Sequence, residues 1–172
     1  MQTASALNKT TQLFALVFTG FLAGSFYYGT LILVPAFYDV PPAVHLVYRV
    51  HLMDHNAIFM QLVNALALLA PFCCAITAKH SKRIRNLSLL AGILAVTTLV
   101  VTRFGNVPVN RRIRTWDPAF PAADWLATLH RWDIFNAIRT TTGIASFLVM
   151  CIVVVFATSK RSEVRTAISP SF

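Results

Sequence analysis

Charged side chains are scarce in this chain, and acidic ones are the rarest. Its 172 residues include 15 Lys or Arg and 6 Asp or Glu, so 12% are charged, against roughly 25% in soluble domains. Hydrophobic residues make up 56%, and the mean hydropathy is +0.64. A soluble fold of 19.1 kDa cannot bury that much apolar surface, which excludes an ordinary soluble enzyme. The 13 Phe residues and long aliphatic runs also exclude a disordered chain.

Cysteine is also scarce, and the three cysteines do not form a disulfide framework. Cys73 and Cys74 are adjacent, a spacing that bridges only with strain. Cys151 lies inside another apolar run. We expect all three to be buried free thiols that behave as small hydrophobic side chains.

The shortage of acidic residues leaves a net charge of +9. No module that combines aromatic and basic residues accompanies these cations, so nucleic acid is not an expected partner. In a membrane protein, excess Lys and Arg sets the topology and contacts anionic headgroups. The lipid bilayer is therefore the expected partner of these charges.

Four long runs of the chain contain no charged residue. They comprise 29 residues between Lys9 and Asp39, 24 between Asp54 and Lys79, 17 between Arg85 and Arg103, and 20 between Arg139 and Lys160. A helix needs about 20 apolar residues to cross the hydrocarbon of a bilayer. The sequence predicts one all-α membrane domain over residues 1–172, a four-helix bundle with spans near 12–35, 52–78, 85–104 and 134–158. Gly20 and Gly24 form a small-xxx-small pair that favours close helix packing, or a homo-oligomer through this face.

The distribution of cations predicts the orientation of the bundle. Residues 79–85 hold four Lys or Arg, and Lys160, Arg161 and Arg165 follow the last span. The positive-inside rule then places both termini in the cytoplasm, in a multi-pass protein of the plasma or inner membrane. Two long loops, 36–51 and 105–133, are expected on the non-cytoplasmic side, although three cations in the second loop oppose this pattern: Arg111, Arg112 and Arg114.

Most of the unusual polar residues lie in or beside these two segments, which include four of the five histidines and all three tryptophans. His51 and His55 are four residues apart, so they share one face of a helix, and Asp54 lies beside them. They are candidates for a general base or for metal ligands, or they cap the helix and bind water. His45 and His80 are expected to be solvated loop residues.

A polar stripe opens the fourth predicted span. Trp132, Asn136, Arg139 and Thr140 fall on one helical face. An arginine at membrane depth is costly and usually faces the bundle interior, so Arg139 is a functional candidate unless it reaches out to the headgroups. Asn106 and Asn110, on either side of Pro108, either cap the third span or present their amides to a ligand.

Two motifs resemble those of the anthrone oxygenase family, a group of small four-span membrane proteins. They are Asn106-x-Pro108-x-Asn110 after the third span and Arg131-Trp132-x-x-x-Asn136-x-x-Arg139 at the start of the fourth. The resemblance implies a four-helix membrane bundle that oxidises polyketide anthrones to anthraquinones with molecular oxygen, without an established cofactor. The residues that it carries over are Pro108, Asn110, Arg131, Trp132, Asn136 and Arg139.

This chemistry assigns roles to the candidate residues. Oxidation of an anthrone begins with loss of a methylene proton, so a base and a donor to the resulting oxyanion are needed. We expect His51, His55 and Arg139 to be catalytic. The expected substrate-binding residues, some of which also serve as oxyanion donors, are Asn106, Asn110, Trp132, Asn136, Asp54 and His130. The many Phe and Tyr rings suit a flat, hydrophobic small-molecule substrate, and O₂ dissolves well in lipid.

Two alternatives use the same residues. In the first, His51, His55 and His130, with Asp54 or Asp133, bind copper, iron or zinc in a metal-dependent membrane oxidoreductase. In the second, the protein is a non-enzymatic four-span accessory or scaffold protein, and its polar stripe contacts a partner helix.

Overall fold

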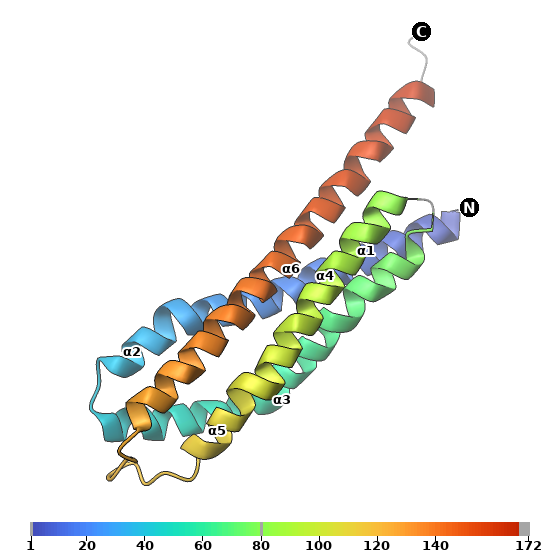
Figure 1. Ribbon diagram of the computed structural model, residues 1–172. Helices are drawn as coiled ribbons and strands as arrows, with labels where there is room; N and C mark the ends of the chain where they lie inside the picture. Colours follow the sequence, from blue (N-terminus) through green and yellow to red (C-terminus); the bar gives the residue numbers. More distant parts are fainter. Residues whose placement is uncertain (1, 80, 169–172) are drawn as a thin grey trace.

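The computed structural model describes residues 2–79 and 81–168, with side chains described for 6–79 and 81–158. These residues form four helical rods and no strand (Figure 1). The first rod comprises α1 (Gln2–Tyr28), the π-helical turn η1 (Gly29–Leu33) and α2 (Val34–Tyr38), and the second is α3 (Pro42–Thr77). The third comprises α4 (Lys82–Val101), the π-helical turn η2 (Thr102–Asn106) and α5 (Val107–Ile113), and the fourth is α6 (Trp125–Ile168).

Four helical segments are long and apolar enough to cross a membrane: Ala6–Tyr38, Pro42–Thr77, Lys82–Ile113 and Trp125–Thr158. The four expected spans are confirmed, but three of them extend well into the segments predicted as loops. The predictions of long loops at 36–51 and 105–133 are wrong, because residues 42–51, 107–113 and 125–133 are helical. Charged and polar residues lower the hydropathy of these segments, which suggested loops. A charged residue does not, however, end a helix.

Each π-helical turn ends two residues before a proline, which is the second residue of the next helix. The proline ring clashes with the carbonyl four residues earlier. For Pro35 and Pro108 these carbonyls belong to Leu31 and Phe104, which lie within η1 and η2. The wider π turn relieves this clash and lets the rod continue, and such turns are frequent at functional sites.

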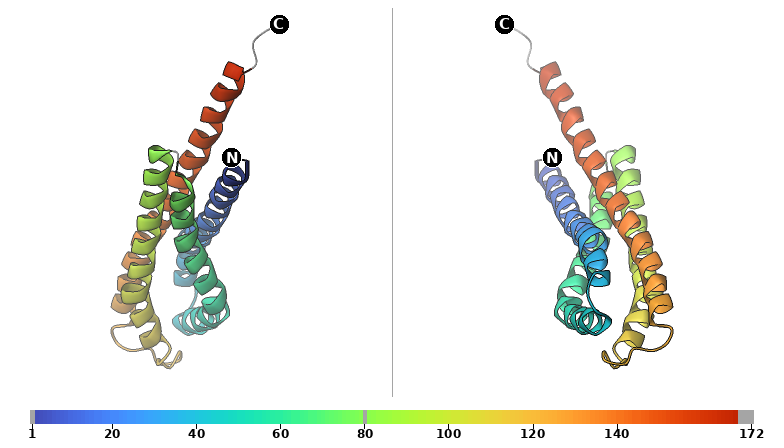
Figure 2. Two further views of the ribbon diagram at one scale, coloured as in Figure 1. Left: turned by 90° about the vertical axis from the view of Figure 1, so that its right-hand side faces the viewer. Right: turned by 90° about the vertical axis from the view of Figure 1, so that its left-hand side faces the viewer.

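The four rods form a closed ring in which α1 packs on α3, α3 on α4, α4 on α6 and α6 on α1. A short turn joins α3 to α4, where the Ser81 side chain accepts a hydrogen bond from the Ile84 N–H at 3.4 Å. This turn lies at the same end as the start of α1 and the last turns of α6, and the α2–α3 and α5–α6 connections lie at the opposite end (Figures 1 and 2). Consecutive rods are therefore antiparallel, and α3 and α6 are diagonal neighbours.

Large apolar side chains cover the outside of the bundle, as expected for helices in lipid, and small residues fill much of its inside. Phe14, Ile58, Leu69 and Ile93 are all more than half exposed. Of the predicted glycine pair, only Gly20 meets a neighbouring helix, since a Cβ there would lie 3.2 Å from the Phe147 ring. A Cβ on Gly24 would meet nothing within 4 Å, so a homo-oligomer through this face stays a prediction.

Candidate functional site

Polar side chains gather inside the bundle at the level of η1, η2 and the first half of α6. Arg139 is 14 residues from the start of α6, or about 21 Å along the helix axis, well inside the span. The cluster around it draws residues from all four rods: Thr30 from the first, Arg49 from the second, Asn106 from the third and Asn136 from the fourth. The buried polar members of this cluster are His45, Arg49, Asn106, Asn136 and Thr140.

Arg49 is the most deeply buried cation described and is only 3% exposed. Its guanidinium lies 4.3 Å from the centre of the Trp132 ring and 5.6 Å from that of Phe37. Asp133 Oδ1 is 3.9 Å from Arg49 Nη2, an ion pair without a hydrogen bond, and Asp133 Oδ2 accepts from the Tyr38 hydroxyl at 2.6 Å. Both Nη atoms of Arg49 have no hydrogen-bond partner among the described residues.

Arg139 lies on the same stripe of α6 as Trp132 and is held by its own helix. Its Nε and Nη2 donate to Asn136 Oδ1 at 2.9 and 2.7 Å, and Asn136 Nδ2 donates to Thr30 Oγ1 of η1 at 2.8 Å. The guanidinium lies 4.5 Å from the centre of the Phe26 ring and 5.2 Å from that of Trp132. The expectation that the arginine faces the interior, rather than the headgroups, is therefore confirmed.

Trp132 is fixed by hydrogen bonds from two asparagines of the third rod. Its indole N–H donates to Asn110 Oδ1 at 2.7 Å, and its backbone carbonyl accepts from Asn106 Nδ2 at 3.1 Å. Neither asparagine side chain caps a helix. Because Asn110 occupies the indole N–H, this group orients the ring and is not a free donor. Asn106 Oδ1 is buried without a partner in the described part of the chain.

The charge balance of this cluster favours an anion. Two guanidiniums lie against one indole ring, with one nearby carboxylate that makes no hydrogen bond to either arginine among the contacts described. An incompletely paired cation is costly in an apolar interior, and ionisable residues retained at membrane depth usually mark a site. Flat aromatic rings and free N–H groups together suit a planar ligand that carries a negative oxygen.

The structure brings together five of the predicted site residues: Asn106, Asn110, Trp132, Asn136 and Arg139. His51 and His55 are exposed, and His55 Nδ1 lies 2.9 Å from the carbonyl oxygen of His51. Asp54 forms an exposed ion pair with Arg114, and the exposed His130 stacks on Tyr38 at 6.1 Å between ring centres. His51 follows Arg49 by two residues, a rotation of about 200° around the helix, which directs it away from the cluster.

No group of three or more His, Cys, Asp or Glu side chains comes within metal-binding reach in the described residues. The His51, His55 and His130 cluster of the metal alternative is therefore not assembled in this structure. All three cysteines are free, as predicted, but the prediction that all three are buried is wrong: Cys73 is exposed, Cys151 is partly buried and only Cys74 is fully buried.

Sequence reasoning missed His45 and Arg49, the two buried ionisable residues of α3. His45 was predicted to be a solvated loop residue, and this is wrong: it lies in the first turns of α3 and is 1% exposed. The two residues are four apart, so a helical interpretation of 42–51 places them on one face. That spacing was the available signal. His80, for which the same prediction was made, lies outside the described residues.

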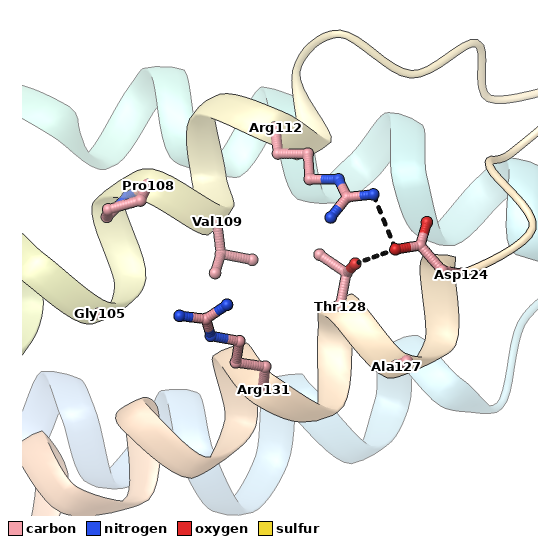
Figure 3. A pocket seen from close by; sticks show the side chains of 8 residues that line it. All are labelled: Gly105, Pro108, Val109, Arg112, Asp124, Ala127, Thr128 and Arg131. Atoms are coloured by element: carbon pink, nitrogen blue, oxygen red, sulfur yellow. Dashed lines mark hydrogen bonds and ion pairs between the residues drawn. The ribbon is translucent and has the colours of Figure 1, made fainter.

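A separate pocket of about 360 Å³ lies beside this cluster, between α5 and the start of α6 (Figure 3). Gly105 and Val109 form its inner wall, and Arg131 reaches into it from α6. Arg112 donates to Asp124 Oδ2 at 2.7 Å across its rim, and Thr128 donates to the same oxygen at 3.3 Å. The motif residues Pro108 and Arg131 therefore line this pocket and not the buried cluster.

These features define a class: an all-α protein with four helices able to span a membrane and a cationic, aromatic site buried between them. The chain belongs to the anthrone oxygenase family, whose sequence profile matches residues 50–149, more than half of its length. This confirms the resemblance carried by the two motifs. Searches among curated proteins and solved structures find no match. Arg49 and His45 precede the matched range, and the other cluster residues of α6 and η2 lie within it.

Proposed function

We propose that this protein is a membrane-embedded oxygenase that converts an anthrone-type polycyclic aromatic substrate to a quinone with O₂ and without a cofactor. The observation that carries the proposal is the pair of guanidiniums against Trp132, that of the buried Arg49 and that of the partly buried Arg139, with both Nη atoms of Arg49 unpartnered in the described structure. Family membership supports an oxygenase-like role. The substrate and the absence of a cofactor are our inference.

The reaction needs little from the protein beyond binding, proton transfer and charge stabilisation. Loss of one methylene proton leaves its electron pair delocalised onto the carbonyl oxygen, and this anion passes one electron to O₂. The resulting radicals combine to form a carbon–oxygen bond. Loss of the second methylene proton then breaks the O–O bond, which gives the quinone and one molecule of water. One oxygen atom enters the product and the other leaves as water, so atoms and electrons balance.

The cluster offers groups for the charged step. Arg49 and Arg139 bind the developing oxyanion, and such stabilisation is usually the largest catalytic contribution in a water-poor site. Phe26, Phe37 and Trp132 provide ring surfaces for a flat substrate. Asn136 and Asn110 keep Arg139 and Trp132 oriented through the hydrogen bonds already described.

The test is oxygen uptake by the purified protein in detergent with unsubstituted anthrone, with and without a strong chelator. We expect uptake above the spontaneous rate that the chelator does not change. With ¹⁸O₂, the quinone should gain one labelled oxygen atom. Arg139→Gln should abolish the acceleration, and the exposed Arg111→Gln at the same end of the bundle is the matched control.

Two results would contradict this function. Uptake that is lost on chelation and restored by copper, iron or zinc would show a metal-dependent oxidoreductase. If the folded protein does not accelerate the oxidation of any anthrone, hydroxylated anthrones included, the accessory or scaffold role is the remaining function. In that case Arg139→Gln should impair assembly with a partner instead of turnover.

A further inference from the structure

His45 is the most fully buried histidine of the described chain and lies in a cage of aromatic rings. Its imidazole stacks on Phe37 with 5.1 Å between ring centres and an interplanar angle of 15°. The rings of Tyr38 and Trp125 lie edge-on to it, at 5.3 and 6.1 Å. Rings of the first and fourth rods therefore surround the imidazole, which extends from the second.

The imidazole also has an unused polar atom. Nε2 of His45 is buried and has no hydrogen-bond partner among the described residues. Buried side-chain nitrogens are nearly always hydrogen-bonded, so this exception calls for an explanation. A nitrogen whose hydrogen-bond partner is a bound substrate has no partner in the protein by itself, and this would explain the exception.

His45 also lies next to the proposed oxyanion site. Arg49 follows it by four residues on the same face of α3, and both side chains contact the ring of Phe37. Asp133, which is paired with Arg49, accepts from the Tyr38 hydroxyl, and the Tyr38 ring packs on His45. A substrate oxygen bound by Arg49 would therefore lie about one helical turn, or roughly 5 Å along α3, from the imidazole.

We propose that His45 is the general base of the reaction, in place of the outward-facing His51 or His55. This proposal rests on the proposed function. Nε2 accepts the methylene proton as the C–H bond breaks, and the electron pair of that bond moves onto the substrate oxygen beside Arg49. The neutral imidazole becomes imidazolium and then returns the proton to the outer oxygen of the peroxide anion. That oxygen leaves as water, together with the second methylene proton, when the O–O bond breaks. A base positioned in this way contributes about 10²–10⁴-fold to the rate.

The experiment measures proton removal without oxygen. Anthrone is incubated with the purified protein in D₂O under argon, and incorporation of deuterium at its methylene carbon is followed by mass spectrometry. The wild-type protein should exchange this position faster than buffer alone. His45→Gln and His45→Asn, which keep a polar side chain but cannot act as a base, should lower the acceleration by at least about 100-fold.

Three controls separate a catalytic effect from a structural one. Val47→Ala changes the exposed side of the same helical turn and should leave exchange unchanged. Thermal unfolding in detergent should give similar melting temperatures for His45→Gln and the wild type. Added imidazole should restore exchange to His45→Ala, whose truncated side chain leaves room for it, but not to His45→Gln.

The outcomes are distinct from those for oxygen uptake. Full exchange in a folded His45→Gln protein, or loss of exchange in His51→Ala or His55→Ala alone, would overturn the assignment. A wild-type protein that does not exchange the methylene proton would also overturn it. If the protein exchanges the methylene proton in a His45-dependent way but takes up no oxygen, the assignment of His45 as the general base is supported and the proposed oxygenase function is refuted.

Discussion

The guanidinium of Arg49 lies 4.3 Å from the centre of the Trp132 ring, although the two residues belong to diagonally opposite helices. Arg49 comes from α3 and Trp132 from α6, so this contact crosses the interior of the bundle. Arg139 lies 5.2 Å from the same ring centre. The indole thus joins the buried Arg49 and the partly buried Arg139 into one site, and its own orientation depends on asparagines of the third rod.

The first prediction concerns the charge and shape of Arg49. Arg49→Lys keeps the charge but loses the planar fork that lies against Trp132, and Arg49→Gln loses both. Removal of one donor to an oxyanion typically costs about 10²–10³ in turnover. We expect kcat for anthrone oxidation to fall by this factor in Arg49→Gln and by less in Arg49→Lys, as measured by oxygen uptake.

The matched control for Arg49 is Arg111→Gln, which removes an exposed cation outside the cluster. Its turnover should equal that of the wild type. Equal losses in both variants would show that overall positive charge, and not the buried site, carries the effect.

The second prediction concerns the hydrogen bond from the Trp132 indole to Asn110 Oδ1, which is 2.7 Å long. Trp132→Phe and Asn110→Ala each remove one side of this bond. Hydrogen bonds between membrane helices contribute about 0.6 kcal/mol on average and up to about 1.7 kcal/mol. The double variant should therefore lose less stability than the sum of the single variants, by an amount in this range.

The free energy of unfolding in mixed detergent micelles measures this coupling. Trp132→Phe with Asn106→Ala is the comparison cycle, because Asn106 donates to the backbone carbonyl of Trp132, which the substitution keeps. Additive losses for Trp132 and Asn110 would refute a stabilising side-chain bond.

The third prediction concerns the close approach of η2 to α6. A Cβ on Gly105 would lie 2.5 Å from Cγ of Phe135, well inside van der Waals contact. Gly105→Ala must displace this ring, and overpacking of this kind costs about 1–3 kcal/mol. We expect a lower melting temperature in detergent and a loss of activity, since Asn106 follows directly.

Gly24→Ala is the matched control, because a Cβ there would meet nothing within 4 Å. Alanine favours the helix over glycine by up to about 1 kcal/mol, so this variant should be as stable as the wild type or slightly more. Adding Phe135→Leu to Gly105→Ala should recover part of the loss. If Gly105→Ala alone is as stable as Gly24→Ala, then η2 and α6 do not pack as closely as the structure shows.

The fourth prediction concerns orientation. Two of the three arginines that oppose the positive-inside pattern are paired with carboxylates, Arg112 with Asp124 and Arg114 with Asp54. We therefore keep the prediction that both termini are cytoplasmic and that the polar site lies nearer the opposite face. A green fluorescent protein fused to the C-terminus should fluoresce, and alkaline phosphatase fused there should be inactive. The reverse result would invert the topology.

The sequence determined the features that depend on local composition. Four uncharged runs were enough to predict four membrane-spanning helices, because the thickness of the bilayer sets the length of apolar helix required. The polar stripe of Trp132, Asn136, Arg139 and Thr140 followed from helical periodicity alone, and the structure places it in the interior. The family was recognisable from two motifs.

The tertiary structure decided where each helix ends and which polar groups meet. Arg49 and His45 raised the polarity of residues 36–51 enough to suggest a loop, yet this segment is mostly helical. These two residues point inward, where side chains of the other rods contact them. The contact between Arg49 and Trp132 joins residues 83 positions apart, and no local pattern encodes such a distance. The same rotation of α3 that buries His45 exposes His51, and only the packing of the four rods fixes that rotation.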